Sequence, residues 1–136
     1  MIQIEIYEHF AAWLDNLLEN NEMPKNTAAF NFNLYDENAE GLVYAMQLIA
    51  SDRFDPDDES GEWACYNAWS SEEDLFMLDF SDEEDQSFEY IQKVFTEFVN
   101  EYLENGKYKD ILLDSQGIGI GHVDGDIDLI YKAEKE

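Results

Sequence analysis

Residues 28–50 read AAFNFNLYDENAEGLVYAMQLIA, and the rest of the chain can be arranged around this stretch. Its first half places apolar side chains such as Phe30 and Phe32 at every second position, which predicts a strand with one buried face. Residues 36–41 have the composition of a turn. Residues 42–50 are apolar at nearly every position, as in an inner strand of a sheet. We therefore expect the two strands to form a hairpin.

Helical and strand periodicities continue on both sides of this hairpin. Apolar residues at helical spacing predict an amphipathic helix over residues 3–20. An Asp124-Gly125 pair between two apolar runs is a strong signal for a second hairpin. The further strands are expected at 63–69, 75–80, 117–123 and 127–131, with a short helical turn at 108–114.

A second long helix is defined by apolar residues that share one face: Phe88, Ile91, Phe95, Phe98, Val99 and Tyr102. Ser81 and Glu84 have the spacing of a capping box at its start. Gly106 is expected to end it.

The order of these elements predicts the fold class. One helix, four strands, a helix and two strands follow one another without βαβ alternation. This order predicts an α+β fold in which helices cover one face of a mainly antiparallel sheet of about six strands. The chain has 136 residues and no internal repeat or linker, so we expect a single domain over residues 1–136.

The composition restricts the function classes. The chain has 33 acidic and seven basic residues, a formal net charge of -26. Such a charge repels nucleic acid and anionic membrane surfaces, and it attracts basic proteins. The single cysteine, Cys65, is expected in a buried strand as an inert thiol. With no signal peptide or membrane-length apolar run, the sequence predicts a cytoplasmic protein.

The acidic residues are concentrated in the middle of the chain. Between Phe54 and Gln92 there are 14 acidic residues and no lysine or arginine, and aromatic residues lie among them. Aromatic side chains surrounded by charge are typical of binding hot spots. The next candidates for a contact surface are the strand at 117–121, where alternating glycines leave one face bare, and the first helix. The expected partner-binding residues are Asp55, Asp57, Asp58, Glu59, Glu62, Trp69, Glu72, Glu73 and Asp74.

No motif predicts catalysis or a cofactor. Asp124, Asp126 and Asp128 have the spacing that opens a calcium-binding EF-hand loop, but Leu129 and Lys135 occupy the positions where that loop needs glycine and glutamate. Two histidines and one cysteine give no zinc-binding pattern. We therefore expect no enzyme, no cofactor and no metal ion. A divalent-metal-binding or metal-assisted hydrolytic domain is an alternative.

In overall pattern the chain resembles the small acidic immunity proteins that bacteria make against secreted or contact-delivered toxins. The resemblance is carried by the hairpin quoted above, the acidic middle, FxxFVNEYL at 95–103 and GIGIGHVDGDIDLIY at 117–131. It implies a cytoplasmic inhibitor that binds a cognate basic toxin, often a nuclease, and blocks its active site. The same electrostatics also fit a free-standing DNA mimic that inhibits DNA-binding proteins in general.

Overall fold

The computed structural model of the chain describes residues 4–36, 43–55, 57, 62–72, 74–80, 84, 87–122 and 127–133. In chain order, its elements are α1 (Ile4–Asn20), β1 (Ala29–Asp36), β2 (Val43–Ser51), the 3-10 helix η1 (Glu62–Cys65), β3 (Asn67–Ser70), β4 (Phe76–Asp79), α2 (Phe88–Asn105), α3 (Lys109–Leu113), β5 (Gly117–His122) and β6 (Asp128–Lys132). The α+β class and the predicted order of helices and strands are confirmed. None of the described helices is long and apolar enough to cross a bilayer.

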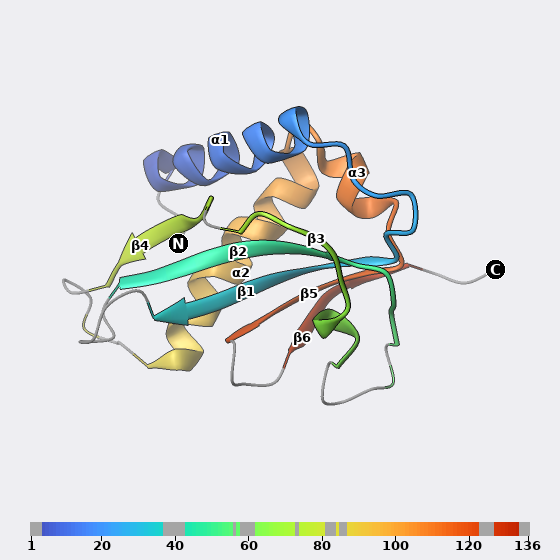
Figure 1. Cartoon of the computed structure of the whole chain (residues 1–136). Coiled ribbons are helices and arrows are strands. Elements are labelled where there is room, and N and C mark those ends of the chain that lie inside the picture. The colour runs from blue at the N-terminus through green and yellow to red at the C-terminus, as the bar shows by residue number, and fades with distance from the viewer. Residues whose placement is uncertain are drawn as a thin grey trace.

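The six strands form one sheet in the order β3-β2-β1-β5-β6, and β4 also pairs with β2 (Figure 1). Every pairing is antiparallel except that of β1 with β5, which runs from Ala29 opposite Gly117 to Leu34 opposite His122. The parallel pair arises because α2 and α3 carry the chain back to the end where β1 begins. There the backbone N–H of Gln116 donates to the carbonyl of Ala28 at 2.7 Å, and β5 enters the sheet alongside β1.

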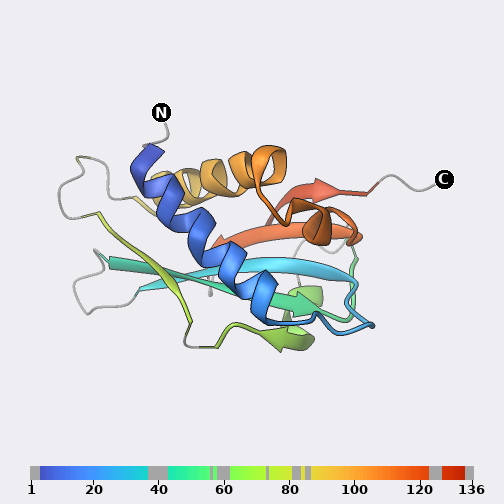
Figure 2. The same cartoon turned by 90° about the horizontal axis from the view of Figure 1, so that it is seen from above.

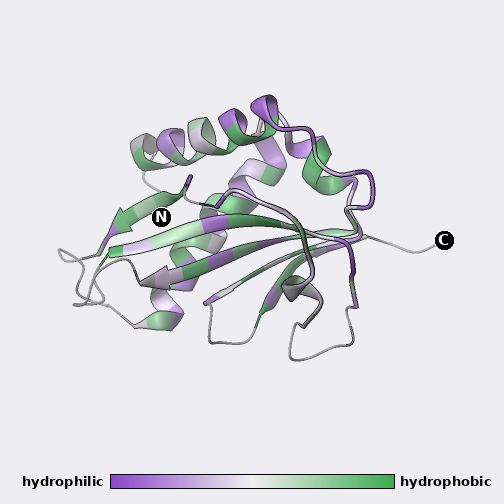
Figure 3. Cartoon of the chain, in the orientation of Figure 1, coloured by the Kyte–Doolittle hydropathy of each residue, from purple (hydrophilic) through white to green (hydrophobic). Residues whose placement is uncertain are grey.

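One face of the sheet packs against α1 and α2. Phe30 and Phe32 of β1 and Ile118 of β5 lie in the same buried cluster as Phe10 of α1 and Phe95 of α2. Figure 2 shows α1 crossing the strands with α2 beside it. In Figure 3, hydrophobic and hydrophilic bands alternate along both helices, which is the pattern of helices with one buried face. The hydrophobic effect of this cluster therefore positions both helices on one side of the sheet.

Both predicted hairpins have their strands paired as expected. In the first, β1 and β2 pair over their full length, from Ala29 opposite Ser51 to Asp36 opposite Tyr44. In the second, β5 and β6 are antiparallel, while the Asp124-Gly125 turn lies outside the described residues. The predicted helix over 3–20 and the helical turn near 108–114 are confirmed as α1 and α3.

The predicted strand over 63–69 is wrong in its first half. Residues 62–65 form η1, and β3 begins only at Asn67. The backbone N–H of Tyr66 bonds to the carbonyl of Trp63 at 3.3 Å, so this segment turns on itself before it reaches the sheet. The pairing of β2 with β3 also shifts its register between Ala50 and Ser51. Cys65 therefore lies in a helical turn and not in a strand, and its side chain is outside the description.

The predicted capping box at Ser81 is also wrong, because α2 begins seven residues later, at Phe88. The cap is Ser87, whose hydroxyl accepts a hydrogen bond from the backbone N–H of Tyr90 at 3.2 Å. Phe88, which the apolar stripe assigned to the core, is 60% exposed, and the buried part of the stripe starts at Ile91. The helix thus begins beyond the edge of the core that it covers.

Gly106 ends α2 as predicted, but for a steric reason. Its φ of -69° is available to any residue, so no left-handed conformation is involved. A Cβ at this position would lie 2.5 Å from the ring of Tyr102. The tyrosine hydroxyl donates to Asp15 of α1 at 2.6 Å and accepts from the backbone N–H of Tyr108 at 3.1 Å. The fully buried Tyr102 therefore joins α1, α2 and the turn before α3.

Replacing Tyr102 with phenylalanine should remove both hydrogen bonds and lower the free energy of unfolding by about 1–3 kcal/mol, since a buried donor and acceptor lose their partner. Burial and the hydrogen bond to Asp15 raise the pKa of Tyr102 above its ordinary value of 10.0. Above about pH 10 the tyrosine hydroxyl ionises in the unfolded chain but stays protonated in the folded chain, which lowers the free energy of unfolding of the wild-type protein. Phenylalanine has no such proton, so the variant does not lose stability in this way.

Urea unfolding at pH 8, 9, 10 and 11 measures this difference. The difference in the free energy of unfolding between the wild-type chain and Tyr102→Phe should become smaller between pH 9 and pH 11. Tyr66→Phe, at a tyrosine that is 39% exposed, serves as control and should change stability by no more than about 0.5 kcal/mol. A Tyr102→Phe chain that unfolds at the wild-type urea concentration would show that the two hydrogen bonds add nothing.

Candidate partner-binding surface

The structure places the predicted contact residues in two separate groups. Asp55 and Asp57 follow β2, and Glu72 and Asp74 lie in the turn that joins β3 to β4; all four are exposed. The four-residue strand β3 lies between the groups: its first residue pairs with Ser51, before the first group, and its last residue precedes the turn of the second group. Of the remaining predicted residues, Glu62 lies in η1 with its side chain outside the description, and Asp58, Glu59 and Glu73 lie outside the described residues.

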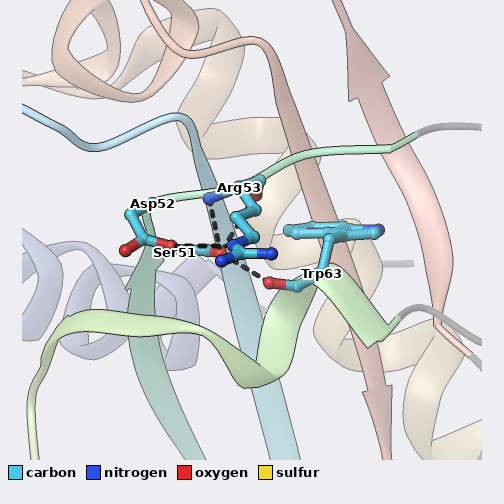
Figure 4. Close-up of polar contacts among 4 residues, drawn as sticks. All are labelled: Ser51, Asp52, Arg53 and Trp63. Carbon is cyan, nitrogen blue, oxygen red and sulfur yellow. Dashed lines mark hydrogen bonds and ion pairs between the residues drawn. The ribbon is translucent and has the colours of Figure 1, made fainter.

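The first group is anchored by the buried hydroxyl of Ser51 (Figure 4). Its oxygen lies 2.5 Å from the carbonyl oxygen of Trp63 and 3.0 Å from that of Arg53, and its single proton is donated to one of them. The same oxygen accepts a hydrogen bond from the backbone N–H of Arg53 at 3.2 Å. The Ser51 hydroxyl, at the end of β2, thus contacts the backbone near both ends of the segment that runs from Arg53 to Trp63, which is called the acidic segment below. Beyond it, Asp55 accepts from the backbone N–H of Asp57 at 3.0 Å.

Two aromatic rings fix this segment to the face of the sheet opposite the helices. Phe54 and Trp63 pack edge to face with ring centroids 5.0 Å apart. A Cβ at Gly117 would overlap the ring of Phe54, and one at Gly119 would lie 2.6 Å from Cγ2 of Ile127 and 3.3 Å from Trp63. The glycines of β5 therefore admit rings of the chain's own, and at Gly117 and Gly119 the bare face predicted for a partner is already occupied.

The same cover explains a buried polar residue on the central strand. Asn31 is fully buried, and its Nδ2 donates to Oδ1 of Asn33 at 2.6 Å. Its own Oδ1 would lie 3.0 Å from a Cβ at Gly119, so the amide also depends on glycine there. β1 is consequently buried on both faces in this region, whereas the sequence predicts one buried face.

The second group sits on a turn held by neutral hydrogen bonds. The hydroxyl of Ser71 accepts from the backbone N–H of Leu48 at 3.1 Å, where β3 and β4 leave a gap in the pairing of β2. Gln47 donates to the carbonyl of Glu72 at 3.1 Å, and Trp13 donates to that of Asp74 at 3.2 Å. Glu72 has a φ of 54°, a left-handed conformation that is uncommon without glycine. The backbone is therefore fixed while the carboxylates point to solvent.

The aromatic residues of the acidic middle have different roles. Trp63 is buried beneath the acidic segment, whereas Trp69 is partly exposed and packs against the core on the helix-covered face. Tyr66 is exposed, and the guanidinium of Arg53 lies 4.1 Å from the centre of its ring. Trp69, predicted as an aromatic anchor, therefore lies on the other face from Phe54 and Trp63.

Few ion pairs form among the residues that the structure describes. Between described residues there are two ion pairs, Arg53 with Asp52 and Lys109 with Asp110, each at 3.8 Å between neighbours in sequence. Exposed pairs of this kind contribute about 0–1 kcal/mol. The hydrogen bonds that shape both acidic groups come from serine, glutamine, tryptophan and backbone groups.

The described residues contain no group of three or more histidine, cysteine, aspartate or glutamate side chains that could hold a metal ion. Of the calcium-loop candidates, only Asp128 is described, and it accepts a hydrogen bond from Gln92 at 2.6 Å. His122 donates from Nε2 to the carbonyl of Phe88 at 3.1 Å.

No protein-family model matches the chain, and neither the curated proteins nor the solved structures contain a match.

Ser51→Ala should lower the free energy of unfolding by about 1–3 kcal/mol, because it leaves the carbonyl of Trp63 and the N–H of Arg53 without their buried partner. Urea unfolding followed by circular dichroism measures the loss. Ser70→Ala, at a half-buried position in β3, is the matched control and should stay near wild type. Equal stability of the two variants would rule out the anchoring role.

Unpaired acids at this density should make the chain more stable in salt. Raising NaCl from about 0.02 M to about 0.3 M shortens the range of repulsion between carboxylates. The urea midpoint should therefore rise, and urea is required because guanidinium chloride is itself a salt. A midpoint that falls with NaCl would mean that the acids stabilise the fold through specific ion pairs.

Proposed function

We propose that the chain is a cytoplasmic immunity protein, which binds a cognate basic toxin and blocks its active site. The observation that carries the proposal is the unpaired charge: 33 acidic against seven basic residues, with only two weak ion pairs among the described residues. Charge of one sign lowers the stability of a compact chain. The chain gains from keeping this charge, despite the loss of stability, if its function is to bind a partner of opposite charge.

The chemistry of such an inhibitor is electrostatic. A nuclease holds phosphates in a positively charged groove, so an acidic and rigid protein surface competes for the same groove. The exposed carboxylates of Asp55, Asp57, Glu72 and Asp74 contribute to the negative field that attracts such a partner. No catalytic residue is needed for this role.

A free-standing DNA mimic is the alternative with the same charge. It would bind several unrelated DNA-binding proteins, whereas an immunity protein would hold one partner tightly. The cheapest discriminating observation is the genome: a toxin gene directly upstream supports the immunity function. Co-expression then tests it, since cells that make the upstream toxin should survive only when this chain is present.

Association with that toxin should slow at least tenfold as NaCl rises from about 0.02 M to about 0.3 M, because salt screens the attraction that steers the two proteins together. Stopped-flow mixing measures the association rate, and the dissociation rate should change less. Displacement of DNA from several unrelated DNA-binding proteins, with no effect on the upstream toxin, would favour the mimic and overturn the proposal.

A further inference from the structure

The fold separates two ends of the sheet that the sequence does not distinguish. At one end, named here the Ser51 end, Ala29, Ser51, Gly117 and Lys132 lie in register across four strands. At the other, the Phe88 end, β1, β4 and β5 finish while β2, β6 and α2 begin. In Figure 1 the Phe88 end is on the left and the Ser51 end on the right.

Basic residues are concentrated at the Ser51 end. Both ion pairs and both contacts of a cation with an aromatic ring lie there. The described bases at this end are Lys25, Arg53, Lys107, Lys109 and Lys132. At the Phe88 end the described residues include one base, Lys93 in the second turn of α2. The exposed acids of that end are Asp79, Glu84, Glu89 and Asp128.

The Phe88 end also carries the most exposed large apolar side chain among the described residues. Phe88 is 60% exposed, although it continues the buried stripe of α2. Its ring lies on that of His122, with centroids 4.8 Å apart and planes inclined by 36°. His122 is held in place by its hydrogen bond to the carbonyl of Phe88 and by the buried ring of Tyr44, 5.6 Å away. One face of the phenylalanine is thus supported while much of the ring remains open to solvent.

The charge of the chain decides which kind of partner fits this surface. A second copy of the chain would be repelled, because each copy has a net charge of -26. Nucleic acid and anionic membranes are negatively charged too, so they would also be repelled. A basic protein is attracted. Among basic side chains, arginine fits best, because its planar guanidinium stacks on an aromatic ring and donates to a carboxylate at the same time. Glu89, next to Phe88, and Glu84 supply exposed carboxylates.

We infer that the Phe88 end is the contact surface of this protein, and that it receives an arginine side chain of a basic partner protein on the ring of Phe88, with Glu84 and Glu89 as counter-charges. The inference rests on the proposed function for the partner's being a basic protein. It adds the location and the side chain that is recognised, and it moves the contact away from residues 55–74.

Titration of the 15N-labelled full chain with a nonapeptide of alternating arginine and glycine tests the location. The largest shift changes are expected at the backbone amides of Phe88, Glu89 and His122. A peptide of alternating lysine and glycine carries the same charge and should bind more weakly, because an ammonium is attracted to a ring face but cannot stack on it as a planar guanidinium does. Largest changes at residues 52–57 or 72–74, or changes spread evenly over the chain, would overturn the inference.

Phe88→Leu removes the aromatic ring but keeps an apolar side chain, so it distinguishes the contribution of the ring from that of hydrophobic contact. The substitution should weaken binding of the arginine peptide about two- to fivefold, the range expected for an exposed contact of a cation with an aromatic ring, and weaken binding of the lysine peptide less. Leucine is a good helix former, so the variant should keep the wild-type spectrum elsewhere. Wild-type affinity of Phe88→Leu for the arginine peptide would contradict the role of the ring.

Two double substitutions of equal charge complete the test. Glu84→Gln with Glu89→Gln changes the Phe88 end, and Glu19→Gln with Glu104→Gln changes exposed positions at the C-terminal ends of α1 and α2. Only the first pair should weaken the peptide markedly; equal losses would mean that net charge alone binds it. The peptide experiments need no toxin. A failed toxin assay with a positive map therefore rejects the function, and the reverse result rejects the location.

Discussion

The first half of the central strand β1 is buried on both of its faces, and much of the architecture follows from this constraint. On one face Phe30 and Phe32 require the cover of α1 and α2. On the other face Asn31 requires a cover that no helix supplies. Phe54 and Trp63 of the segment that follows β2 pack on this face, and they reach the sheet because the neighbouring strand β5 has glycine at alternate positions. An unpaired charge is costly in such an enclosed stretch, and the one acid of β1, Asp36, is its last residue.

The interactions that stabilise the fold are therefore mostly neutral. Aromatic contacts link α1, α2 and β4 through Phe10, whose ring lies 5.9 Å from that of Phe98 and 5.3 Å from that of Phe76. The hydroxyl groups of Ser51 and Ser71 form hydrogen bonds with backbone groups near the ends of β2 and β3. The carboxylate of Asp15 does take part, but its partner is the uncharged hydroxyl of Tyr102. Among the described residues folding makes little use of ionic pairing, which is consistent with the basic partner that we propose.

The sequence predicts most of the elements because their patterns are local. Alternation of apolar residues locates β1 and β2, and helical spacing locates α1 and α2. The errors arise where a distant group decides between local alternatives. Residues 62–65 alternate like a strand, but the hydroxyl of Ser51 captures the carbonyl of Trp63 and they form η1. Ser81 and Ser87 are both suitable caps, and packing of the helix on the sheet selects Ser87. For the candidate surface, sequence spacing reports how many acids are present but not that β3 separates them.

The range of each force explains why acidic residues alone do not locate a contact. Charges act over a Debye length of about 8–10 Å at moderate salt, so carboxylates all over the surface contribute to steering a basic partner. Holding that partner requires groups that come into van der Waals contact and lose water, and such contacts are dominated by a few aromatic or arginine side chains. Residues 55–74 have the density of acids that steering needs, yet the buried Trp63 and the partly buried Trp69 are already engaged in the fold. Phe88 has its ring supported by His122 and open to solvent, so the surface that holds the partner need not coincide with the part of the sequence that attracts it.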